Sequence, residues 1–241
     1  MSPKRSRSAA TRSTASSTAS TSSSRAANVS TEAAPASGAD PRIKAAQPGA
    51  SARRRNDKPR FAWAITGSGH MLEESLDLAR ALPNVDLYLS AAAAEVLPLY
   101  KLSIETLKRD FRVFRDNSRS SVPVGLLYAD FYHTLVVAPA TSNTVAKCAF
   151  GISDTLPTNM FAQAGKLGIP GIVYACDTEP VVITRSPREW VELRPRNIEL
   201  ENVARLRTID FCRVASSLDE LRTALETRLR ELSLTWKESS S

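Results

Sequence analysis

Hydrophobic positions after residue 60 follow two patterns: short apolar runs, and longer stretches with apolar residues at helical spacing. Continuous apolar runs are typical of buried strands, whereas apolar residues three to four positions apart are typical of helices that bury one face. The runs predict strands at Phe61–Thr66, Val85–Ser90, Phe111–Phe114, Thr134–Ala138 and Gly171–Ala175. The helical spacing predicts helices at His70–Leu82, Ala91–Leu107, Ser142–Phe150, Leu156–Leu167 and Leu218–Leu232.

The order of these elements predicts the fold class. Strands alternate with helices, and strands that are apolar throughout need cover on both faces, which indicates a parallel sheet between two helical layers. Pro139 is expected to close the fourth strand, and Gly168 to end the helix before the fifth. We therefore expect a single doubly wound α/β domain at residues 59–241, a Rossmann- or flavodoxin-like three-layer sandwich.

Residues 1–58 have a different composition from the rest. They are rich in Ser, Thr, Ala and Arg, and no aromatic residue precedes Phe61. Such a segment cannot bury enough apolar surface to offset its chain entropy, so we expect a disordered basic tail. Its composition also fits an organelle transit peptide, although it offers no apolar face for a targeting helix.

Charge and composition exclude several classes of function. The chain of 241 residues carries a net charge of +7, but that excess belongs to the tail, so the folded part is close to neutral and no nucleic-acid partner is expected. No apolar run reaches the roughly 18 residues of a membrane span, and no secretory signal is present, which predicts a cytoplasmic protein without membrane contact. Three separated cysteines, Cys148, Cys176 and Cys212, and two histidines predict no metal centre.

Two predicted strand-to-helix loops suit a ligand. In a doubly wound sheet, ligands bind beyond the carboxyl ends of the strands, where the winding reverses. The first loop, Thr66-Gly-Ser-Gly69, has glycines that permit close backbone approach, although such turns also arise for steric reasons alone. The second, Pro139-Ala-Thr-Ser-Asn-Thr144, has four hydrogen-bonding side chains at a helix start, where capping needs one. A phosphate between two helix N-termini fits both loops.

A longer motif surrounds the second loop. The stretch Ala138-Pro-Ala-Thr-Ser-Asn-Thr-Val-Ala-Lys147, continued by Gly151-Ile-Ser-Asp154 and Thr158-Asn159, resembles the Pro-Ala-Ser-Ala-Asn-Thr signature of a flavoprotein family. That family includes the homo-oligomeric flavin-containing cysteine decarboxylases. The resemblance covers about residues 60–232. Within the family, this loop and Tyr174-Ala-Cys-Asp177 are most similar to the branch of archaeoflavoproteins and dihydromethanopterin reductases.

The resemblance implies FMN as the cofactor. It implies phosphate contacts from the two loops, a ring contact from Ser90 and a flavin or substrate contact from Asn143. The residues that it assigns to the FMN site are Thr66, Gly67, Ser68, Ser90, Thr141, Ser142, Asn143, Thr144 and Asn159.

The resemblance also implies an activity and an assembly. The expected reaction is reduction of a dihydropterin, dihydromethanopterin to tetrahydromethanopterin. The electrons would come from an external donor, namely a small iron–sulfur protein, another flavoprotein or NAD(P)H. The expected assembly is a homo-oligomer built from trimers. In it, Leu156–Phe161 either lines a neighbour's flavin or is buried in its own subunit.

Departures from the decarboxylase pattern bear on the reaction. Those enzymes carry a histidine at the position where this chain has Gly125, and glycine cannot act as a base. They also carry a Pro-x-Met-Asn clamp, where this chain has Ala175-Cys-Asp-Thr-Glu-Pro180. A lyase similar to phosphopantothenoylcysteine decarboxylase is therefore disfavoured, although it remains an alternative. A non-catalytic FMN electron-transfer protein is another.

Two residues are candidates for proton transfer. His70 opens the first helix beside the expected flavin, where it could donate a proton or be a plain surface histidine. Asp177 follows the last predicted strand, where it could bind the pterin, relay a proton or cap a loop. His133 precedes a buried strand and is expected to be structural. Lys147 either balances flavin charge or lies on the surface.

Overall fold

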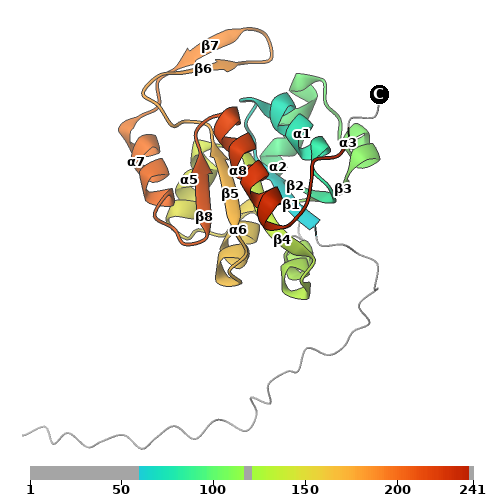
Figure 1. The fold of residues 1–241 in the computed structure, drawn as a ribbon. Helices are drawn as coiled ribbons and strands as arrows, with labels where there is room; N and C mark the ends of the chain where they lie inside the picture. The colour runs from blue at the N-terminus through green and yellow to red at the C-terminus, as the bar shows by residue number, and fades with distance from the viewer. Residues whose placement is uncertain (1–59, 117–120, 239–241) are drawn as a thin grey trace, which may run out of the picture. The chain divides into compact units, whose positions relative to one another are not determined.

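The computed structural model describes residues 60–116 and 121–238, and the tail predicted at 1–58 lies outside them. Six strands of the described part form one sheet in the order β3-β2-β1-β4-β5-β8, and every neighbouring pair is parallel (Figure 1). The strands are β1 (Arg60–Ile65), β2 (Val85–Leu89), β3 (Arg112–Arg115), β4 (Tyr132–Ala140), β5 (Gly171–Ala175) and β8 (Cys212–Ala215). The expected doubly wound α/β fold is thereby confirmed.

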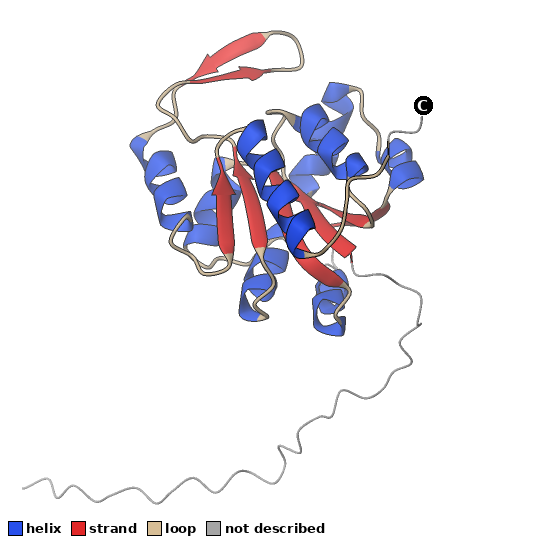
Figure 2. Cartoon of the chain, in the orientation of Figure 1, coloured by secondary structure: helices blue, strands red, loops and turns tan. Residues whose placement is uncertain are grey.

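Helices cover both faces of this sheet (Figure 2). On one face lie α1 (Leu72–Ala81), α2 (Ala91–Val96), the 3-10 helix η1 (Leu97–Tyr100), α3 (Ile104–Asp110) and α8 (Leu218–Glu231). On the other lie α4 (Ser121–Val124), the 3-10 helix η2 (Gly125–Ala129), α5 (Ser142–Ala149), α6 (Leu156–Lys166) and α7 (Asn197–Leu206). Successive strand residues point to opposite faces, so the continuous apolar run of β1 serves both layers. Trp63 packs under the first group, and Ala62 and Ala64 under the second.

The helix predicted over Ala91–Leu107 is wrong, because the chain breaks there twice. Pro98 lies in the first turn of η1, and Lys101 ends it in the left-handed region with φ 59°. Ser103 then starts α3 by accepting a hydrogen bond from the N–H of Thr106 at 3.0 Å. A helix N-cap of this kind marks a new helix rather than a continuing one.

The predicted end of the fourth strand is also wrong, because β4 continues through Pro139 to Ala140. Proline has no N–H to give to a neighbouring strand, and the pairing of β4 with β5 shifts register between Val137 and Ala140. The irregular stretch accommodates the proline without ending the strand.

Three strands and two helices follow β5, and of these only α8 was predicted. The sequence suggested that β5 is the last strand, which is wrong. An antiparallel hairpin of β6 (Val182–Arg185) and β7 (Trp190–Leu193) forms a separate two-stranded sheet (Figure 1). Then come α7 and β8, which joins the main sheet beside β5. Asp177 therefore lies in the connection from β5 to the hairpin.

Candidate functional site

The winding of the sheet reverses between β1 and β4. From β1 the chain adds β2 and β3 on one side, then returns to place β4, β5 and β8 on the other. The carboxyl ends of β1 and β4 are therefore adjacent, and such a switch point is where doubly wound folds bind ligands. Both loops predicted from the sequence leave the sheet here.

Thr66 joins the two loops to each other. Its hydroxyl donates to the carbonyl of Pro139 at 2.8 Å and accepts from the N–H of Thr141 at 2.9 Å. The side chain is buried, and a hydroxyl has only one proton to donate. Thr66, predicted as an FMN contact, thus fixes the relative position of the loops.

The glycines of the first loop lie against the protein's own residues, Gly67 against Ala92 and Gly69 against the side chain of Tyr100. A Cβ on Gly67 would lie 2.6 Å from the Cβ of Ala92, and one on Gly69 would lie 1.8 Å from the hydroxyl oxygen of Tyr100. Both distances are far below van der Waals contact. The sequence left open whether this glycine turn serves a ligand or arises for steric reasons, and these distances show a steric role.

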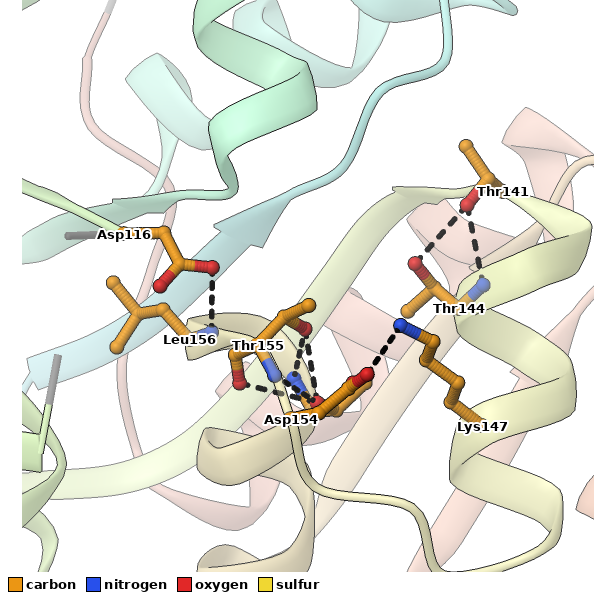
Figure 3. A network of polar contacts seen from close by, with 8 residues as sticks. Asp116, Thr141, Thr144, Lys147, Asp154, Thr155 and Leu156 are labelled. Atoms are coloured by element: carbon orange, nitrogen blue, oxygen red, sulfur yellow. Dashed lines mark hydrogen bonds and ion pairs between the residues drawn. The ribbon is translucent and has the colours of Figure 1, made fainter. Parts of the chain in front are cut away.

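The second loop ends in a capped helix with spare donors. Thr141 accepts from the N–H of Thr144 at 3.2 Å, and their hydroxyls lie 3.0 Å apart (Figure 3). Within the described residues, the N–H groups of Ser142 and Asn143 have no acceptor. Free N–H groups at a helix start carry partial positive charge and favour an anion. The chemistry of these donors fits a phosphate group.

A cavity of about 300 Å³ lies beside both loops, bounded on its far side by the hairpin. Six predicted site residues line it: Gly67, Ser68, His70, Thr141, Ser142 and Asp177. From the sequence, these residues were expected to be neighbours only because ligands bind where the winding of such a sheet reverses. In the structure they line one cavity.

Four other predicted residues lie along the same sheet edge without lining this cavity. The hydroxyl of Ser90 caps α2 by accepting from the N–H of Ala93 at 2.9 Å, and the hydroxyl of Thr144 is bonded to Thr141. Asn143 is exposed. Asn159 lies in the first turn of α6, where the N–H of Leu156 donates to the carboxylate of Asp116, just after β3, at 2.9 Å.

His70 is held by the hairpin. Its Nδ1 lies 2.9 Å from the hydroxyl of Thr184 in β6, and the hydroxyl of Tyr100 donates to the carbonyl of Arg185 at 2.9 Å. Burial lowers the pKa of His70, while the nearby carboxylates of Asp177 and Glu74 act in the opposite direction. The imidazole is therefore uncharged at neutral pH.

The sequence reasoning missed Thr184 and Tyr100. The apolar stretch Val181-Val-Ile183 that precedes Thr184 is a short strand signal, but no pattern predicts a contact to a residue 114 positions earlier.

The contacts bear on two alternatives that the sequence left open. Lys147 forms an ion pair of 2.8 Å with Asp154, whose pKa it lowers through their hydrogen bond, so its charge is already balanced (Figure 3). Met160 is fully buried in the core of its own subunit, while Phe161 is half-buried.

Comparison with known proteins identifies the family. Residues 50–227 match the family model described as flavoprotein. The chain is a member of the flavoprotein family. The family predicted from the second loop is confirmed.

Solved and curated relatives agree with this membership. The crystal structure of Burkholderia xenovorans DmrB in complex with FMN, described as a cubic protein cage for redox transfer, is 66% identical. It superposes with a TM-score of 0.70 over 75% of this chain and 99% of that one. A dihydromethanopterin reductase (acceptor) of Methanosarcina mazei is 40% identical over 141 residues, which are 53% of this chain and 59% of the relative. An uncharacterized protein of Methanocaldococcus jannaschii is 37% identical over 67% of this chain and 91% of its own length.

No helix within residues 60–116 and 121–238 combines the length and the apolar character needed to cross a lipid bilayer.

Proposed function

We propose that this protein is an FMN-dependent oxidoreductase that reduces a dihydropterin, such as dihydromethanopterin, with electrons from an external donor. The observation that carries the proposal is the meeting of two donor-rich loops at the switch point of the sheet. Two relatives support it: the FMN-bound structure that is 66% identical, and the dihydromethanopterin reductase that is 40% identical over about half of this chain.

The two loops would hold the phosphate of FMN. Ser68 offers a hydroxyl, and the start of α5 offers the free N–H groups of Ser142 and Asn143. Ser90 and Asn159 lie further along the same edge and would face the ring side of the cofactor. When bound, FMN supplies the hydride chemistry, and the protein supplies binding and orientation.

His70 is our candidate for proton exchange with the pterin. An uncharged imidazole carries a proton on one ring nitrogen and accepts one on the other. Thr184 fixes the ring through Nδ1, which leaves Nε2 for the substrate. Asp177 lines the same cavity, and its charge raises the pKa of His70, which opposes the effect of burial. Its carboxylate would also accept hydrogen bonds from the amide and amine of a pterin.

The electrons are expected to come from a separate protein or nucleotide. The three cysteines of the sequence form no Cys-x-x-Cys pair, and the first loop lacks the third glycine of a dinucleotide fingerprint. A small iron–sulfur protein, a second flavoprotein or NAD(P)H would then deliver electrons to the same site that receives the pterin.

The assembly is expected to consist of trimers. The relative that is 66% identical is described as a cubic cage, and a closed cubic arrangement contains threefold axes. Light scattering of the purified protein should give a mass that is a multiple of three subunits. A monodisperse monomer or dimer that binds FMN stoichiometrically would contradict this expectation.

Anaerobic mixing tests the activity. The purified protein should be yellow, and mass analysis should identify the released chromophore as FMN.

After photoreduction, addition of a dihydropterin should reoxidise the flavin and yield the tetrahydro form in equal amount. Reoxidation by an artificial acceptor but by no pterin in a panel would indicate an electron carrier, and carbon dioxide release from a cysteine-type substrate would indicate a lyase. Either result would contradict the proposal.

A further inference from the structure

A buried thiol reaches the first loop from the other side of the site. Cys176 follows β5, and its Sγ lies 3.2 Å from the hydroxyl oxygen of Ser68, 108 residues earlier in the chain. Cys176 is 6% exposed and lines the same cavity as Ser68. The bond links the end of β5 directly to the turn after β1.

Ser68 already receives two hydrogen bonds from the protein. Besides the thiol, the N–H of His70 donates to its oxygen at 3.1 Å. A serine hydroxyl has two acceptor positions and one proton. With both acceptor positions filled, the only remaining capacity of Ser68 is donation of that proton, and Ser68 lines the cavity. A hydroxyl prepared in this way favours an acceptor such as a phosphate oxygen.

The thiol remains a donor at neutral pH. Burial, with a smaller contribution from the neighbouring carboxylate of Asp177, raises the pKa of Cys176 to about 12. The S–H proton therefore stays on the sulfur, and no thiolate charge is present to repel an anion.

We propose that Cys176 is a positioning residue for the phosphate of the cofactor. Its S–H donates to the hydroxyl oxygen of Ser68, so that the Ser68 hydroxyl proton is directed to a phosphate monoester. This inference rests on the proposed function, which assigns the FMN phosphate to the two loops. It goes further in naming a residue that acts on the phosphate through the Ser68 hydroxyl and thereby sets the preference for a phosphorylated ligand.

Paired titrations with FMN and riboflavin test the proposal, because riboflavin is the same ring system without the phosphate. Full-length protein is freed of flavin and titrated by fluorescence quenching. In Cys176→Ala we expect FMN affinity to fall by about threefold to tenfold, the range of one hydrogen bond, with riboflavin affinity unchanged. Cys176→Ser keeps a donor at the same position and should retain FMN affinity within about twofold.

Two further variants separate positioning from general packing. In a Ser68→Ala background, Cys176→Ala should have no additional effect on FMN affinity, because the hydroxyl that it positions is gone. Cys148→Ala removes another buried thiol, in α5, and should leave the ratio of FMN to riboflavin affinity unchanged. Thermal unfolding of each flavin-free variant confirms folding.

The outcomes are distinct. Loss of FMN and riboflavin affinity in equal proportion in Cys176→Ala, or an undiminished effect of Cys176→Ala in the Ser68→Ala background, would overturn the positioning role while leaving the proposed function intact. A protein that binds neither flavin would instead overturn the proposed function.

Discussion

The two edges of the six-stranded sheet both carry a hollow, and the hollows differ in chemistry. At the amino edge, where β5 and β8 begin, a cavity of about 480 Å³ is lined mostly by apolar side chains, among them Phe161, Ile209 and Phe211. At the carboxyl edge, the cavity of about 300 Å³ is lined by glycines, hydroxyls, His70 and Asp177. Only the smaller one adjoins the switch point and the free N–H groups of a helix start. Convergent polar groups, rather than volume, therefore mark the candidate site.

The two histidines of the chain show the same contrast. Burial lowers the pKa of both. At the carboxyl edge, Asp177 and Glu74 oppose that effect on His70, whereas near the amino edge Arg228 adds to it and the pKa of His133 falls to about 4. The ring of His133 packs edge-on against Phe61 with centroids 4.4 Å apart. Both imidazoles are uncharged at neutral pH, and neighbouring charge opposes the effect of burial on the pKa at His70 and adds to it at His133.

The largest effect on FMN binding is expected from one methyl group at the carboxyl edge. In Gly69→Ala the new Cβ would lie 1.8 Å from the hydroxyl oxygen of Tyr100, so the loop or the tyrosine must move. A shift of the loop withdraws the Ser68 hydroxyl from the proposed phosphate position, and we expect FMN affinity, measured by flavin titration, to fall about tenfold or more, the value of one hydrogen bond to a charged group.

A matched control lies between β3 and β4. In Gly125→Ala the added Cβ meets nothing within 4 Å, so FMN affinity and thermal stability should not change. Unchanged FMN affinity in Gly69→Ala would show that the first loop takes no part in flavin binding.

A smaller effect is expected from a single hydroxyl. Ser142→Ala removes a side chain that lines the cavity and should weaken FMN binding by about 1–2 kcal/mol, the value of a charge-assisted hydrogen bond. Adding Thr144→Ala should increase the loss only slightly, because the Thr144 hydroxyl is bonded to Thr141.

The corresponding change at the other edge is Ala162→Leu, which partly fills the larger apolar cavity. It should leave FMN affinity as in the parent protein. If Ala162→Leu weakened FMN binding more than Ser142→Ala does, the assignment of the two edges would be reversed.

The central elements were predictable because each has an unambiguous local signal. Gly171–Ala175 is a continuous apolar run between turn residues, and β5 has the predicted bounds. The segment from 176 to 217 was missed because its strands are four residues long and mostly exposed on one or both faces. A signal for α7 was present, since Val203 and Leu206 have helical spacing and are buried.

The candidate site was predictable where it depends on local sequence, and not where it depends on long-range contact. The two loops precede helices, so their polar residues could be identified as donors at helix starts. By contrast, Thr184 reaches His70 from a strand whose short apolar signal indicates no partner, and Cys176 reaches Ser68 across the sheet edge. Such contacts follow from the tertiary arrangement of β1, β5 and the hairpin.

The smallest effect concerns the pH dependence of stability and comes from His133. Its ordinary pKa of 6.5 applies to the unfolded chain, whereas the folded protein binds that proton only near pH 4. In between, the unfolded state holds more protons, so the free energy of unfolding should decrease as the pH falls, with the loss beginning near 6.5 and ending near 4. His133→Asn should reduce this slope in denaturant titrations from about pH 7 to pH 5, where few carboxyl groups titrate. His70, whose pKa is also lowered, contributes to the slope that remains, so the double variant with His70→Asn should reduce it further. A slope unchanged by His133→Asn would mean that His133 is as easily protonated in the fold as in the unfolded chain, and the contrast between the two edges would then not extend to their histidines.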